Sequence, residues 1–260
     1  MSEAHAAPDP SGGHRRLLVY GVESGIVGQH GLFTGYGSLW MPWERRGDFM
    51  RILREVRLAH AYSGPIDLSH LKTDAEAFAL ALIDEVFQRR WLSYRCLIAK
   101  GHVDTDSDPR AFTRLIAQRL VALPGGLADR ELRLRVTKNA RSAGPNGDRT
   151  IDHLERLLAD RVPAPPTFDR SLRAARSAEP LEVVELLTSL VVSDWERRPT
   201  TAYRKKLSLR AAENLGWSDL AADTQPSEWK FNIWYLPDPR EEAASESTQR
   251  SVQLRLPLID

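Results

Sequence analysis

The chain has 260 residues, of which 42% are hydrophobic and 27% are charged, a composition typical of a globular protein. This composition excludes a disordered chain, a coiled coil and a collagen-like repeat. The 36 basic residues balance 35 acidic ones, so no global charge attracts nucleic acid, and such binding would require a local patch. The single cysteine, Cys96, excludes an intramolecular disulfide and a multi-cysteine zinc site.

The ends of the chain differ in composition from its centre. Residues 1–14 are rich in Ala, Pro, Gly and Ser, which predicts a disordered lead-in. Residues 15–237 are predicted to form one domain, and residues 238–260 a polar linker that ends in an apolar tail. The sequence contains neither an apolar leader nor an apolar run of transmembrane length, so we expect a cytoplasmic protein that has no membrane partner.

The first predicted elements form a hairpin. A strand over 17–20 is expected to end in a turn over 21–25, where two glycines occur, and a second strand covers 32–39. Helices over 43–59 and 74–90 follow, each with apolar residues on one face. The next predicted strand covers 92–99.

The second half of the chain continues this alternation of helices and strands. We expect a helix over 110–122, a half-buried strand over 131–137, a helix over 150–161 and a weak strand near Phe168. The most apolar helix, over 181–195, is expected to be central and mostly buried, and a basic helix over 203–214 follows it. Residues 231–235 predict a final strand or a packing clasp. This order of elements predicts one α/β domain with a mixed sheet.

Four segments in chain order resemble the domain of unknown function numbered 3800. They are residues 18–25, 92–100, 181–187 and 230–234. The family has a strand ending in Asp-Glu-Ser-Gly at the first segment and Lys-Phe-Asn-Ile-Trp at the last, which Lys230–Trp234 matches in full. The resemblance implies a single ribonuclease-H-like domain, with a mixed central sheet flanked by helices, in a family regarded as metal-dependent nucleases.

The resemblance also implies a set of site residues. In a ribonuclease-H-like layout, acids from the first strand, a later strand end and a late helix converge on two divalent ions, which here would be magnesium or manganese. The matching catalytic positions are Glu23, Asn139 and Glu185, of which Glu23 and Glu185 are the expected metal ligands. Asp194, further along the late helix, is a second candidate.

This chain departs from the family at the acidic positions. Val22 stands where the family has its first Asp, Asn139 is neutral, and Glu185 is longer by one methylene than the family's Asp. Because carboxylates offset the dehydration of a divalent ion, we expect a metal site that is weakened or lost. The alternative is a non-catalytic binding or assembly module of a larger complex, including a defence-related one, and the sequence leaves open whether the protein is an enzyme.

A basic segment follows the apolar helix. Arg198, Arg204, Lys205 and Lys206 cluster there, and the aromatic residues Trp195 and Tyr203 are interleaved with basic residues. Such a pattern can bind a phosphate backbone and stack on bases, so nucleic acid is the expected partner. The alternative is a solvated helix with ordinary packing aromatics. A protein partner is expected to bind through the C-terminal tail.

Overall fold

The computed structural model describes residues 16–25, 32–66, 68, 71, 73–100, 131–136, 146–159, 166–168, 179–197, 201–225 and 228–236. The expected lead-in, the helix over 110–122, the C-terminal linker and tail, and the site residues Asn139 and Arg198 therefore lie outside the described residues.

The described strands form one six-stranded sheet. They are β1 (Arg16–Gly25), β2 (Phe33–Pro42), β3 (Ser93–Lys100), β4 (Glu131–Val136), β5 (Thr167–Phe168) and β6 (Phe231–Leu236). Their order across the sheet is β5-β4-β1-β2-β3-β6. Strand β2 pairs antiparallel with β1 and β3, whereas β4 is parallel to β1, β5 to β4, and β6 to β3. The sheet is therefore mixed, as predicted.

The strand directions define one edge of the sheet at which five strands end. Strands β1, β3, β4, β5 and β6 all end at the edge where β2 begins, and we call it the carboxyl edge. The predicted turn over 21–25 is wrong, because β1 continues to Gly25, which pairs with Thr34. The glycines at 21 and 25 do not end the strand, because pairing with β2 continues along it.

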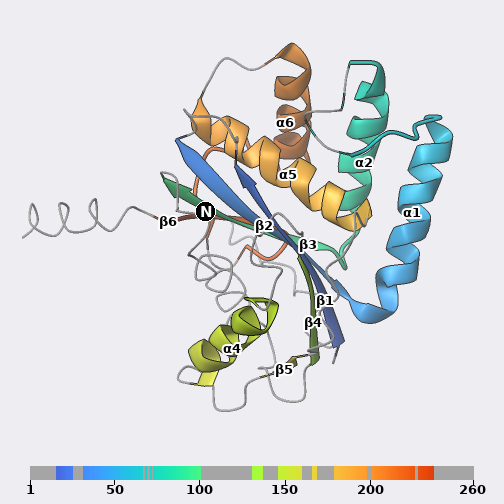
Figure 1. The fold of residues 1–260 in the computed structure, drawn as a ribbon. Coiled ribbons are helices and arrows are strands. Elements are labelled where there is room, and N and C mark those ends of the chain that lie inside the picture. The colour runs from blue at the N-terminus through green and yellow to red at the C-terminus, as the bar shows by residue number, and fades with distance from the viewer. Residues whose placement is uncertain are drawn as a thin grey trace, which may run out of the picture.

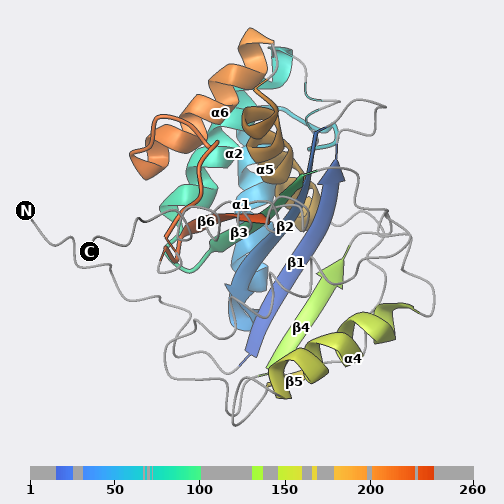
Figure 2. The same ribbon diagram turned by 90° about the vertical axis from the view of Figure 1, so that its left-hand side faces the viewer.

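Helices cover both faces of the sheet. They are α1 (Arg46–Ala59), α2 (Glu76–Gln88), α4 (Asn146–Ala159), α5 (Glu179–Glu196) and α6 (Ala202–Leu215), with short 3-10 turns at Trp43–Arg45 and Thr73–Ala75. Figure 1 shows α1, α2, α5 and α6 on one face and α4 on the other. Figure 2 shows α4 lying beside β4, where Leu154 and Leu158 are fully buried.

The main core lies between the sheet and α5. This helix packs on β1 and β2, and its apolar side chains between Leu181 and Val192 are buried, as predicted. Alternate residues of β1, namely Leu18, Tyr20 and Val22, meet it from the sheet. The basic helix α6 begins at the cap residue Thr201, whose side chain accepts a hydrogen bond from the Arg204 amide, and ends at Gly216 in the left-handed conformation.

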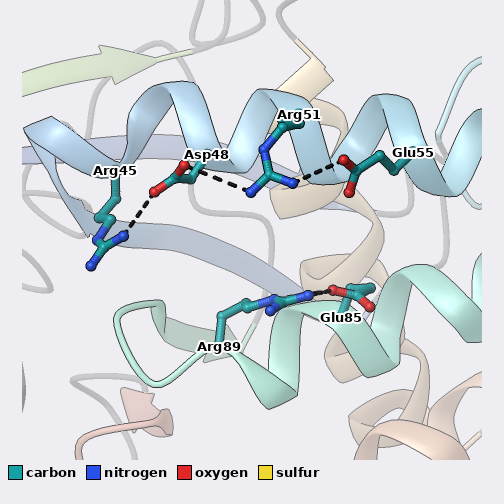
Figure 3. A network of polar contacts seen from close by, with 6 residues as sticks. All are labelled: Arg45, Asp48, Arg51, Glu55, Glu85 and Arg89. Carbon is teal, nitrogen blue, oxygen red and sulfur yellow. Dashed lines mark hydrogen bonds and ion pairs between the residues drawn. The ribbon is translucent and has the colours of Figure 1, made fainter.

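Charged side chains on the exposed face of α1 pair with one another. Asp48 contacts Arg45 at 2.9 Å and Arg51 at 3.8 Å, and Arg51 contacts Glu55 at 2.9 Å (Figure 3). On the neighbouring α2, Arg89 pairs with Glu85. This face of α1 is thus a solvated surface of local ion pairs.

The architecture confirms the predicted fold class. An antiparallel β1-β2-β3 meander is extended on the β1 side by the parallel strands β4 and β5, and on the β3 side by β6, which gives the predicted mixed sheet flanked by helices. None of the helices in the described part of the chain combines the length and apolarity that a membrane span requires.

Candidate functional site

The first predicted catalytic position lies on β1, and the second follows the neighbouring parallel strand β4 in the sequence. Gly21 on β1 is the register partner of Val136, the last residue of β4, and Glu23 is the partner of Tyr36 on β2. Both β1 and β4 therefore end at the carboxyl edge, where open α/β sheets bind ligands. The structure describes the backbone of Glu23, whereas its side chain and all of Asn139, three residues beyond β4, lie outside the described part.

Val22 is a core residue of the sheet. Its side chain is 3% exposed and belongs to the apolar cluster that packs under α5. Its register partner is Gly37 on β2. The position that carries the first Asp in the family thus holds a buried hydrocarbon that has no oxygen to offer an ion.

Helix α5 places Glu185 near the same level of the sheet. Thr188, three residues later, packs directly against Gly37, the partner of Val22. Since a helical turn holds 3.6 residues, Glu185 lies within one turn of the point where α5 crosses that level. The Glu185 side chain is half-exposed.

Asp194, the second candidate acid, accepts hydrogen bonds that hold the fold together. Its Oδ2 accepts hydrogen bonds from the Ser208 hydroxyl at 2.5 Å and from the Leu220 amide at 3.0 Å. This carboxylate therefore joins α5 to α6 and to the segment that follows α6.

Glu196 is the acid of α5 that reaches the carboxyl edge. Its side chain is 6% exposed, and Oε1 accepts hydrogen bonds from the backbone amides of Leu32 at 2.6 Å and Phe33 at 2.8 Å. Nothing in the local sequence pattern predicts this role, because Glu196 binds a strand more than 160 residues earlier in the chain.

The described residues do not complete a divalent-ion site. Within them, no group of three or more His, Cys, Asp or Glu side chains is placed to hold a metal ion. Val22 is apolar, and Asp194 and Glu196 use carboxylate oxygens on backbone amides. The donor set in the described part of the chain therefore does not fit two magnesium or manganese ions.

The basic residues of α6 are mostly engaged with their neighbours. Lys206 pairs with Glu76 of α2, and the Arg204 guanidinium donates to the Leu68 carbonyl at 3.4 Å. Arg210 binds both carboxylate oxygens of Asp84 at 2.7 and 2.8 Å. The side chain of Lys205 is exposed. These contacts attach α6 to α2 and reduce the positive charge available to a ligand.

The two aromatic residues of the basic segment lie in different places. Tyr203 is buried, and burial raises the pKa of its hydroxyl to about 12. Trp195 instead contacts Phe33 and Tyr235 at the carboxyl edge, with ring centroids at 5.7 and 5.2 Å. Tyr203 is thus a packing residue, and Trp195 belongs to a separate aromatic cluster.

The Lys230–Trp234 segment, which carries the fullest match to the family, has structural contacts. The Lys230 ammonium donates to the carbonyls of Val86, Arg89 and Leu92 at 2.7–2.9 Å, and so ties the end of α2 to the start of β3. The Asn232 amide donates to Thr224 Oγ1 and to the Gln225 carbonyl, which holds the preceding loop against β6.

Comparison with known proteins shows no family for this chain. No family model and no curated protein matches the chain. Among solved structures, the chain is similar to the ribonuclease H2 from Pyrococcus horikoshii OT3, with 12% identity, a TM-score of 0.36, and coverage of 81% of this chain and 90% of that chain. A TM-score this low supports no functional statement.

Proposed function

We propose that this protein acts on or binds nucleic acid through a ribonuclease-H-like domain whose metal site is weakened or lost, and that it is a divergent member of the family numbered 3800. The observation that carries the proposal is the parallel pairing of β1 with β4, in which Gly21 faces Val136. This pairing supports the convergence of Glu23 with the segment after β4 at the carboxyl edge. On α5, Glu185 lies within one helical turn of Thr188, which packs against Gly37, the partner of Val22.

The side chain at position 22 accounts for the weakened site. A buried valine contributes no ligand charge, and the surrounding apolar groups penalise an ion that approaches from the α5 face. Glu23 and Glu185 are left as the two matched carboxylates, fewer than a two-ion centre requires.

The burial of Val22 also favours a second function. Because Val22 packs into the core in place of an acid, the domain also fits a non-catalytic binding or assembly module. Such a module would bind its partner without metal-dependent cleavage.

The experiment that separates these functions is a binding and cleavage assay on one protein preparation. Fluorescently labelled RNA and DNA, single- and double-stranded, are titrated by anisotropy with and without magnesium or manganese, and the same mixtures are run on denaturing gels. Metal-dependent cleavage abolished by Glu23→Gln supports a working nuclease, and binding without cleavage supports the module. The absence of both binding and cleavage overturns the proposal.

A further inference from the structure

Three aromatic rings meet at the carboxyl edge, on the sheet face that α5 covers. Trp195 of α5 and Tyr235 of β6 are stacked, with centroids 5.2 Å apart and an interplanar angle of 20°. Phe33, the first residue of β2, meets both rings edge-on at 5.7 and 6.3 Å. All three side chains are half-buried, and we call them the aromatic platform.

Polar contacts fix each segment that carries a ring. The Phe33 amide donates to Glu196, the Trp195 indole N–H donates to the Leu220 carbonyl at 3.1 Å, and the Tyr235 amide donates to Asp223 at 2.5 Å. The rings are therefore held before any ligand arrives, which lowers the entropy lost on binding.

Cationic side chains flank the aromatic platform. Lys100, at the end of β3, is the register partner of Phe33, and its side chain is exposed. Arg197 follows Glu196 directly at the end of α5 and is exposed as well. The nearby acids Glu196 and Asp223 are directed at backbone amides of the platform itself. The surface thus combines aromatic rings with positive charge.

We propose that the aromatic platform stacks the unpaired bases of a single-stranded nucleic acid, whose phosphates lie toward Lys100 and Arg197. This inference rests on the proposed function and specifies the substrate class of the same edge. Aromatic stacking accepts any base, because every base has a π-face, and it requires bases that are not paired in a duplex. The platform begins on β2, which pairs with β1, the strand that carries position 23.

Two oligonucleotides of equal length distinguish base stacking from phosphate binding. A labelled oligo(dT) and its abasic counterpart carry the same phosphates, and only the first carries bases. We expect the wild type to bind oligo(dT) more tightly by about tenfold or more, the scale of one to two stacked bases. An oligonucleotide containing 2-aminopurine should lose fluorescence when it binds the wild-type protein, because stacking quenches that base.

Variants assign the effect to the platform. Tyr235→Leu should remove most of the preference for oligo(dT) and leave binding of the abasic strand unchanged, whereas Tyr235→Phe should keep the preference. Trp217→Leu is the matched control, since this half-buried ring packs edge-on against Phe231 at the opposite end of β6.

The outcomes distinguish this inference from the function on which it rests. Equal binding of the two strands by the wild type, unquenched 2-aminopurine, or tighter binding of a duplex overturns the platform. An unchanged preference in a folded Tyr235→Leu protein also overturns it. If the protein binds no nucleic acid at all, the proposed function itself fails.

Discussion

Thr188 on α5 packs onto Gly37 of β2 so closely that a β-carbon at position 37 would lie 1.9 Å from the Thr188 Oγ1. The Thr188 hydroxyl donates to the Val184 carbonyl at 2.6 Å and lies 2.8 Å from the Tyr94 hydroxyl. The missing side chain at position 37 thus lets α5 cross the sheet beside Val22. Glu185 lies three residues before Thr188 on α5, so its position relative to the sheet depends on this contact.

Replacing Gly37 tests the crossing directly. Gly37→Ala should lower the free energy of unfolding by about 1–3 kcal/mol or more, because the helix must move to admit the methyl group. Urea denaturation followed by circular dichroism measures the change. A Gly37→Ala protein as stable as the wild type would contradict the close crossing.

Gly47 provides the matched control for this substitution. It lies in α1, and a β-carbon there meets nothing within 4 Å. Gly47→Ala should therefore raise the free energy of unfolding by about 0.5–1 kcal/mol, because alanine loses less backbone entropy in a helix. The two glycine substitutions should change stability in opposite directions.

The buried thiol of Cys96 should lower the free energy of unfolding at alkaline pH. Complete burial raises the pKa of its thiol from 9.0 to about 12. Above pH 9 the unfolded chain releases this proton and the folded protein keeps it, so stability falls as pH rises. Between pH 9 and 10 the wild type should lose about 1 kcal/mol more than Cys96→Ala in urea denaturation. Parallel curves for the two proteins would show that the thiol titrates normally.

The buried ammonium of Lys230 should make the free energy of unfolding rise with pH near neutrality. Burial lowers the pKa of its ammonium from 10.5 to about 7. Between pH 7 and 9 the unfolded chain therefore binds more protons than the folded protein, so stability should rise with pH by about 2 kcal/mol. Lys230→Met should abolish this rise and lower stability overall by about 1–3 kcal/mol, because three carbonyls lose their donor. A flat wild-type profile would mean that those carbonyls keep the ammonium charged.

The order of elements could be predicted because local patterns determine it. Alternation of polar and apolar residues predicts β4, and the apolar run from Leu181 predicts the central helix α5. The end of β1 could not be predicted, because two glycines indicate a turn locally, whereas pairing with β2 extends the strand to Gly25. The close contact of Gly37 with α5 could not be predicted either, because its partner Thr188 lies far along the chain.

The candidate site was less accessible to sequence reasoning than the fold. The resemblance indicated where acids should occur, but it did not indicate that Asp194 and Glu196 hold backbone amides. The Lys230–Trp234 segment carries the fullest match to the family, and its contacts are structural. A charged residue in a sequence does not reveal its partner, and for Lys206 that partner is Glu76 on another helix.

The basic residues of α6 give a prediction that separates ligand binding from packing. If Lys205 contacts phosphate, Lys205→Glu should weaken nucleic-acid binding and lower the slope of log K against log salt by about 1, without changing stability. Lys206→Glu should instead loosen α6 from Glu76 and lower the free energy of unfolding. Salt titrations by anisotropy and urea denaturation of both variants measure these effects. An unchanged salt slope for Lys205→Glu would assign this face of α6 to ordinary surface.

Restoring the family's acids gives the sharpest test of the proposal that the metal site is weakened. Val22→Asp combined with Asn139→Asp places carboxylates at both altered positions. Because position 22 is 3% exposed, a carboxylate there without metal should lower the free energy of unfolding by about 3–5 kcal/mol. A divalent ion that binds the new site should return about 2.7 kcal/mol at a concentration of 100 times its dissociation constant. Melting curves with and without magnesium or manganese measure both effects.

Val19→Asp combined with Asn139→Asp is the control, since Val19 is equally buried in β1 and lies outside the family's acidic position. The same response to metal in this control, or none in the Val22→Asp double variant, would contradict a metal site at these positions. Metal-dependent cleavage by the unmodified protein would contradict the proposal that Val22 impairs the metal site.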